Sequence, residues 1–134
     1  MVGAELRAWA CGDPVVVTLR GDLDVVDAAS AAAAVLAATA GGQRVIVDLA
    51  ALEFIDCCAL GALARVQELA RRVGGDVLLA APQGSVLRLL DLTGLAGVFS
   101  IHASVAAAAA GLGSARYAPR RPVVGVAPLS VSLV

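Results

Sequence analysis

Residues 44–63, RVIVDLAALEFIDCCALGAL, contain the pattern that decides the fold. The run RVIVDLAAL is almost continuously apolar after its first arginine, which is typical of a central strand covered on both faces. From residue 59 to residue 73, apolar residues recur every three or four positions, and arginine, glutamine and glutamate lie between them. This spacing predicts an amphipathic helix. A buried strand that leads directly into such a helix indicates an α/β domain.

The segments on either side repeat this alternation. Before the central strand, we expect a two-stranded hairpin over residues 5–21, then an alanine-rich helix that Asp24 or Asp27 can cap and that Gly41-Gly42 ends. After it, we expect strands over 76–82 and 97–101 and helices over 85–94 and 104–112, with Ser85 as a cap. The order β-β-α-β-α-β-α-β-α predicts a mixed sheet that is mostly parallel, with an antiparallel N-terminal edge strand.

Length and charge exclude several classes of function. The chain has 134 residues, enough for one domain with a single core, and its formal net charge is -1 at pH 7. No basic patch precedes residue 116, which argues against nucleic-acid binding. The uncharged stretch 92–115 is interrupted by glycine, serine and threonine, and the N-terminus lacks a signal-peptide pattern. We therefore expect no membrane insertion and a cytoplasmic location.

The last residues differ in composition from the rest. We assign residues 1–113 to a single domain and residues 114–134, which contain proline, glycine and a small basic cluster, to a C-terminal tail. The apolar end of this tail, VVGVAPLSVSLV, is too short to span a bilayer. It can add to the edge of a sheet, so a homodimer through the tail or an edge strand is one candidate assembly.

The cysteines Cys11, Cys57 and Cys58 are odd in number and lack the spacing of a metal site. A disulfide between Cys57 and Cys58 would be strained, because adjacent Cα atoms lie about 3.8 Å apart and a bridge usually spans about 4.4–6.8 Å. We therefore expect free thiols in a reducing compartment, without a metal or a cofactor.

Three segments resemble a known family. VVVTLRGDLDVVDA, RVIVDLAALEFIDCCALGAL and GGDVLLAAPQGSVLRLLDLTGLAGVF resemble the STAS domain and, within that family, the bacterial anti-sigma factor antagonists, over residues 14–110. The resemblance implies a regulator of transcription and stress response that is not an enzyme. It implies binding to an anti-sigma factor of the serine-kinase type, which frees a sigma factor. In the family, that kinase phosphorylates the first serine of D-S-S-G-L-G, and the phosphorylated antagonist releases its partner.

The resemblance assigns roles to individual positions. Cys57 falls on the phosphorylated serine and Cys58 on the serine after it, and Asp24 and Asp56 match acidic neighbours of the switch. Ala59 replaces the usual glycine. The implied partner-binding surface comprises Asp22, Asp24, Asp27, Asp56, Cys57, Cys58, Ala59 and Gly61, with Ser85 and Arg88 at its rim.

A cysteine at the switch position leaves several interpretations open. Cys57 can imitate unphosphorylated serine and leave the protein permanently able to bind, or its oxidation can replace phosphorylation. Alternatively, both cysteines are inert residues buried at the corner between strand and helix. Two other functions also stay open: a STAS subunit of a signalling scaffold or lipid-transport complex without a phosphorylation switch, and a thiol enzyme with a Cys57–His102 dyad.

Overall fold

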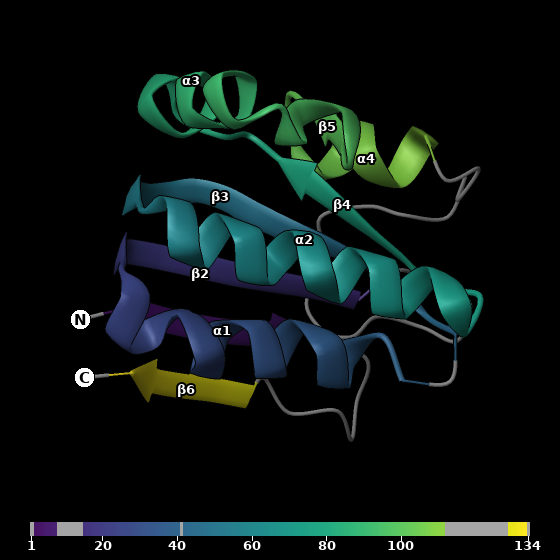
Figure 1. Ribbon diagram of the computed structural model, residues 1–134. Helices are drawn as coiled ribbons and strands as arrows, with labels where there is room; N and C mark the ends of the chain where they lie inside the picture. Colours follow the sequence, from purple (N-terminus) through teal and green to yellow (C-terminus); the bar gives the residue numbers. More distant parts are fainter. Residues whose placement is uncertain (1, 8–14, 41, 112–128, 134) are drawn as a thin grey trace.

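The computed structural model describes residues 2–7, 15–40, 42–111 and 129–133 of the chain. Its elements are β1 (Val2–Arg7), β2 (Val15–Leu23), α1 (Val25–Ala38), β3 (Arg44–Ile55), α2 (Cys57–Arg72), β4 (Asp76–Ala80), α3 (Gly84–Thr93), the short 3-10 helix η1 (Leu95–Gly97), β5 (Ser100–His102), α4 (Val105–Gly111) and β6 (Leu129–Leu133) (Figure 1). The predicted order is confirmed from β1 to α4, and β6 is an additional strand. None of the helices in the described ranges is long and apolar enough to cross a membrane.

The six strands form one sheet in the order β5-β4-β3-β2-β1-β6. Strands β2, β3, β4 and β5 are parallel to one another, and β1 is antiparallel to both β2 and β6. The N-terminal strand is therefore antiparallel, as predicted, but it does not lie at the edge. Without β6, β1 would leave a row of unpaired backbone groups along one side, and the end of the chain pairs with that row.

Two sequence predictions fall wholly or partly outside the described residues. Cys11, expected to be a free thiol, and the turn of the predicted hairpin lie in the range 8–14. The boundary at residue 113 lies in the range 112–128, so the division into a domain and a tail stays a prediction. Residues 129–133, however, are part of the sheet.

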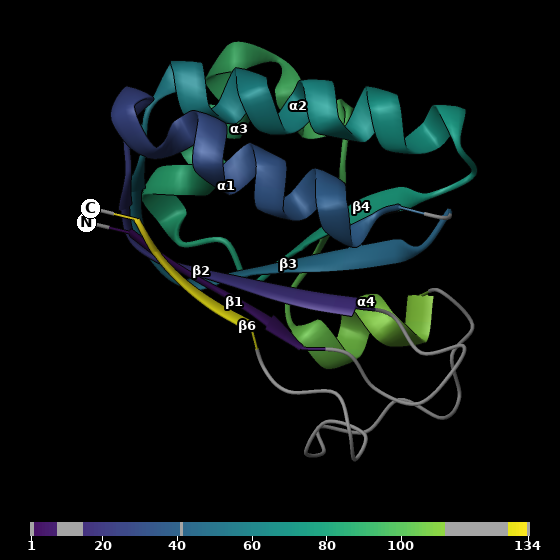
Figure 2. The same cartoon turned by 90° about the horizontal axis from the view of Figure 1, so that it is seen from below.

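Helices cover both faces of the sheet. Figure 2 shows α1, α2 and α3 on one face and α4 on the other. Alternate residues of β3 face the two layers: Val45 and Val47 belong to the larger core under α1 and α2, and Ile46 packs in a smaller cluster with Ala108 and Ala109 of α4. This two-sided burial explains why the central strand is almost continuously apolar, as predicted.

A buried glutamine fixes α2 on the sheet. The sequence pattern places Gln67 on the exposed face of this helix, but it is 0% exposed. Its Nε2 donates to Asp76 Oδ1 (2.8 Å) and to the carbonyl oxygen of Val77 (3.0 Å), and its Oε1 accepts from the backbone N–H of Val77 (2.7 Å). The exposed positions include Leu69 and Val73, which the pattern had placed on the buried face. Leu60, Leu63 and Val66 are buried, as the pattern predicts. The predicted buried face is therefore correct up to Val66 and wrong beyond it.

Candidate functional site

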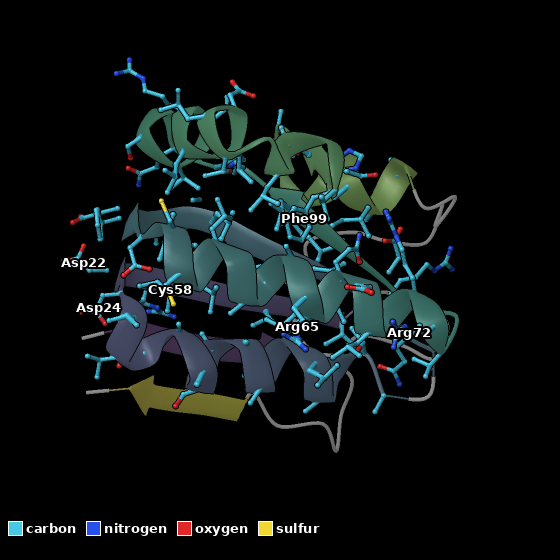
Figure 3. All side chains as sticks on the ribbon, viewed as in Figure 1. Asp22, Asp24, Cys58, Arg65, Arg72 and Phe99 are labelled. Atoms are coloured by element: carbon cyan, nitrogen blue, oxygen red, sulfur yellow. The ribbon has the colours of Figure 1, made fainter. Side chains whose placement is uncertain are left out.

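The candidate site lies where β2 and β3 end and two helices begin. The register pairs Leu23, the last residue of β2, with Ile55, the last residue of β3. Each strand is followed at once by an aspartate that caps a helix, Asp24 for α1 and Asp56 for α2. Because parallel strands end at the same edge of a sheet, the two helix N-termini share one end of the molecule. Figure 3 shows Asp22, Asp24 and Cys58 at this end.

Both aspartates have a structural task. The Asp24 carboxylate accepts from the backbone N–H groups of Val26 (3.0 Å) and Asp27 (3.2 Å), which confirms its predicted capping role. The Asp56 carboxylate accepts from the N–H of Ala59 (2.8 Å). These bonds satisfy amides that have no partner within the helix. The Asp56 N–H also donates to the carbonyl oxygen of Leu23 (3.1 Å), which ties the two helix starts together.

The two thiols are the first two residues of α2, and both are free and exposed. The interpretation that they are buried packing residues is therefore wrong. The reason is the phase of the helix: Ala59, Leu60 and Leu63 face the core, so positions 57 and 58 face solvent. Cys57 occupies the first helical position, next to the cap, without being enclosed by other residues.

The remaining predicted residues divide into exposed and buried ones. Asp22, Gly61, Ser85 and Arg88 are exposed, and a Cβ atom at Gly61 would meet nothing within 4 Å. Asp27 and Ala59, by contrast, are only 6% and 1% exposed, so the expectation that they touch a partner is wrong. Both belong to the first turn of a helix and point inward, where they pack beneath the surface.

The sequence predicts Ser85 as the cap of α3, and this prediction is wrong. The N-cap is Gln83, which makes no side-chain capping bond. Instead, the Ser85 hydroxyl donates to the carbonyl oxygen of Glu53 (3.2 Å), and Gln83 Nε2 donates to the carbonyl oxygen of Ala50 (2.9 Å). These two bonds hold the start of α3 against the second half of β3. They keep Ser85 and Arg88 close to the same end of the sheet.

The sequence did not reveal the apolar part of this surface. Val25 and Val26 at the start of α1 are 60% and 74% exposed, Phe54 near the end of β3 is 51% exposed, and Leu87 of α3 is also exposed. Phe54 and its neighbours lie beside irregularities in the β2–β3 register, which shift residues out of strict alternation. Exposed apolar side chains that are rimmed by polar ones are typical of protein–protein contact surfaces.

Gly61 also borders an open hollow along α2. The hollow has a volume of about 700 Å³, and Ala64, Arg65, Glu68, Arg71 and Val98 line it together with Gly61 and Gln67. It contains no nucleophile or histidine. Among the described residues, no group of three His, Cys, Asp or Glu side chains is arranged to hold a metal ion.

The alternative Cys57–His102 dyad is not formed. The register pairs His102 with Ala80, and Ala80 with Asp48 in the middle of β3. Ile55, the last residue of β3, lies seven positions beyond Asp48, which is about 23 Å at about 3.3 Å per residue, and Cys57 lies beyond Ile55. These two residues therefore do not form the site of a thiol enzyme.

Comparisons with known proteins agree with this fold. The family model described as the STAS domain matches residues 10–108. The anti-sigma-F factor antagonist RsfA of Mycobacterium tuberculosis is 33% identical over 94 residues, which are 66% of this chain and 71% of RsfA. The crystal structure of an anti-sigma factor antagonist from Mycobacterium paratuberculosis has a TM-score of 0.73 at 24% identity and covers 84% of this chain and 95% of its own. Unphosphorylated SpoIIAA, a Bacillus cell fate determinant, has a TM-score of 0.67 at 22% identity and covers 82% and 96%.

Proposed function

The chain belongs to the STAS domain family, and we propose that it is an anti-sigma factor antagonist. In this role it binds an anti-sigma factor of the serine-kinase type and thereby frees a sigma factor for transcription. The observation that carries the proposal is the exposed first turn of α2 in a chain that is 33% identical to an anti-sigma-F factor antagonist. That turn projects from the sheet beside a second helix start, where a partner has free access.

The proposed docking surface combines polar and apolar groups. Asp22, Cys57, Cys58 and Gly61 are its centre, and Ser85 and Arg88 are its rim, and all six are exposed. Val26 and Phe54 supply apolar area that a partner can bury. Asp24 and Asp56 contribute negative charge although their carboxylates are engaged in capping. A partner of this surface should present apolar groups together with basic ones.

We propose that the thiol of Cys57 takes the place of the phosphorylatable hydroxyl. A serine kinase does not transfer phosphate efficiently to a thiol, so control needs another reaction. A hydroperoxide can oxidise the exposed thiol: the sulfur takes one oxygen and becomes a sulfenic acid, the peroxide O–O bond breaks, and water or an alcohol leaves. Further oxidation gives an anionic sulfinate. Added bulk and charge next to Asp56 then oppose docking, as a phosphate would.

Titration calorimetry against the anti-sigma kinases encoded by neighbouring genes tests both the antagonist role and the control by oxidation. Reduced protein is expected to bind, oxidised protein is expected to bind at least about tenfold more weakly, and Cys57→Ser should bind equally well before and after oxidant. Cys58→Ser, which changes the neighbouring exposed thiol, is the matched control and should keep the response to oxidant.

The outcomes separate the two parts. Absence of binding under reducing conditions contradicts the antagonist role. An equal loss of affinity in wild type and Cys57→Ser contradicts redox control through this thiol. A stable large assembly in native extract, without affinity for any anti-sigma kinase, would point to a scaffold subunit instead.

A further inference from the structure

The outermost strand of the sheet has a palindromic sequence. β6 reads Leu129-Ser130-Val131-Ser132-Leu133, the same in both directions. It pairs with β1 from Leu6↔Leu129 to Val2↔Leu133 without a register shift, so its outer side is a straight row of backbone donors and acceptors. Among the described residues, no strand lies beyond it.

The two edges of the sheet differ in how well they are protected. β5, at the opposite edge, has three residues, and a short edge strand offers little for another chain to pair with. β6 has five residues and contains no charged residue and no proline, the features that usually prevent edge-to-edge pairing. This edge is therefore the one at which a second chain can add.

We infer that β6 pairs with β6 of a second copy of this chain in a two-fold symmetric, antiparallel arrangement. The palindrome identifies the partner, because centring the pair on Val131 places every residue opposite a residue of its own type. Leu129 then lies opposite Leu133 of the second copy and Ser130 opposite Ser132, and Val131 lies on the axis. Isologous interfaces of this kind are the commonest route to homodimers. Five paired residues form a small contact, so the dimer should have a low affinity and form only at high protein concentration.

The helix beside this edge does not oppose a second copy. α1 lies over the end of the sheet that β1 and β6 form (Figure 1). Its sequence, VVDAASAAAAVLAA, has a single charged residue, Asp27, which is 6% exposed. Its exposed positions are valine, alanine, serine and leucine. The uncharged exposed face of α1 allows two identical chains to approach without like-charge repulsion from this helix.

The dimer leaves the docking surface at α1 and α2 free. β6 runs in the same direction as β2, since both are antiparallel to β1. Antiparallel pairing of two β6 strands therefore sends the carboxyl ends of the two sets of parallel strands in opposite directions. The two docking surfaces then lie at opposite ends of one continuous sheet. This assembly does not rest on the proposed function and is tested on the chain alone.

Two double variants test the pairing by sedimentation equilibrium of the full chain. Both carry Ser130→Lys. Position 130 lies opposite Glu5 within the chain, so a lysine there places opposite charges across the β1–β6 pair. Adding Ser132→Glu places Lys opposite Glu twice across the dimer axis, whereas adding Ser132→Lys places Lys opposite Lys twice. The first variant should dimerise at least as tightly as wild type, and the second should lose affinity by about tenfold or more, an effect that salt reduces.

The first variant is the control for folding of the second, because they differ only at position 132, which lies opposite Gly3 within the chain. Both should keep the circular dichroism spectrum of wild type. Wild-type protein that stays monomeric up to about 1 mM refutes the inference. A dimer that responds equally to both double variants also refutes it, because such a dimer uses another surface or exchanges β6 onto β1 of the second copy.

Discussion

Replacing Gln67 with leucine should lower the free energy of unfolding, although leucine is the more apolar residue and the position is buried. Both backbone groups of Val77 bond to the Gln67 side-chain amide, the N–H at 2.7 Å and the carbonyl at 3.0 Å. β5 pairs with β4 only from Leu78 onward, so the glutamine amide takes the place of the strand that does not reach Val77. Leucine has a similar volume but cannot form either bond.

The magnitude follows from the groups left without a partner. Gln67 and Val77 are both 0% exposed, so water cannot replace the lost amide. Each unsatisfied buried backbone group costs about 1–3 kcal/mol, and the better burial of a leucine side chain offsets part of this, which leaves a net loss of about 2–4 kcal/mol. That is a large share of the roughly 5–15 kcal/mol by which a domain of this size is stable.

Urea unfolding followed by circular dichroism measures this loss. The midpoint should fall without a change in the slope m, because the surface exposed on unfolding stays the same. Glu68→Leu is the matched control: its residue is the next one in α2, and its ion pair with Arg72 (3.0 Å) is largely exposed. Such pairs contribute about 0–1 kcal/mol. If Gln67→Leu costs less than about 1 kcal/mol, the bonds to Val77 do not carry the stability assigned to them.

Four further outcomes are expected. Gly61→Ala should raise the free energy of unfolding by up to about 1 kcal/mol, because the position is open and helical, whereas Gly61→Gln should keep the fold and weaken anti-sigma factor binding in calorimetry. Gly42→Ala should cost at least about 2 kcal/mol in urea unfolding, since its φ is +81° and a Cβ would lie 2.7 Å from the carbonyl oxygen of Val73. Asp24→Ala should cost about 1 kcal/mol through the lost cap of α1, and an unchanged midpoint would contradict that role. Cys57→Ser should accept radiolabelled phosphate from the partner kinase, and labelling of wild-type protein would contradict the substitution argument.

The order of the elements could be predicted because each depends on a local pattern. The apolar run of β3, the glycine pairs and the N-cap Asp24 all act within a few residues. The buried face of α2 is predicted correctly up to Val66 but not beyond it, because glutamine is polar and polar residues usually face solvent. The buried residues of this helix form a stripe with one polar member: Ala59, Leu60, Leu63, Val66, Gln67 and Ala70.

Features that depend on distant parts of the chain could not be predicted. β6 is a strand because β1, more than a hundred residues earlier, leaves an edge to pair with, and its own composition gives no sign of that partner. The exposure of Phe54 depends on the register between β2 and β3, which the sequence of either strand alone does not fix. The candidate surface was thus identified by its acidic and thiol residues, but its apolar share was not.

The local structure explains how the residue at position 57 can change its chemistry while the fold stays the same. The capping of α2 is performed by the Asp56 carboxylate and the packing of its first turn by Ala59 and Leu60, so position 57 has neither task. An exposed first-turn residue with no structural partner is free to be serine or cysteine. Cys57→Ser should therefore unfold at the same urea concentration as wild type while losing the response to oxidant. A loss of more than about 1 kcal/mol would instead mean that the thiol packs in the fold, and that its presence needs no regulatory explanation.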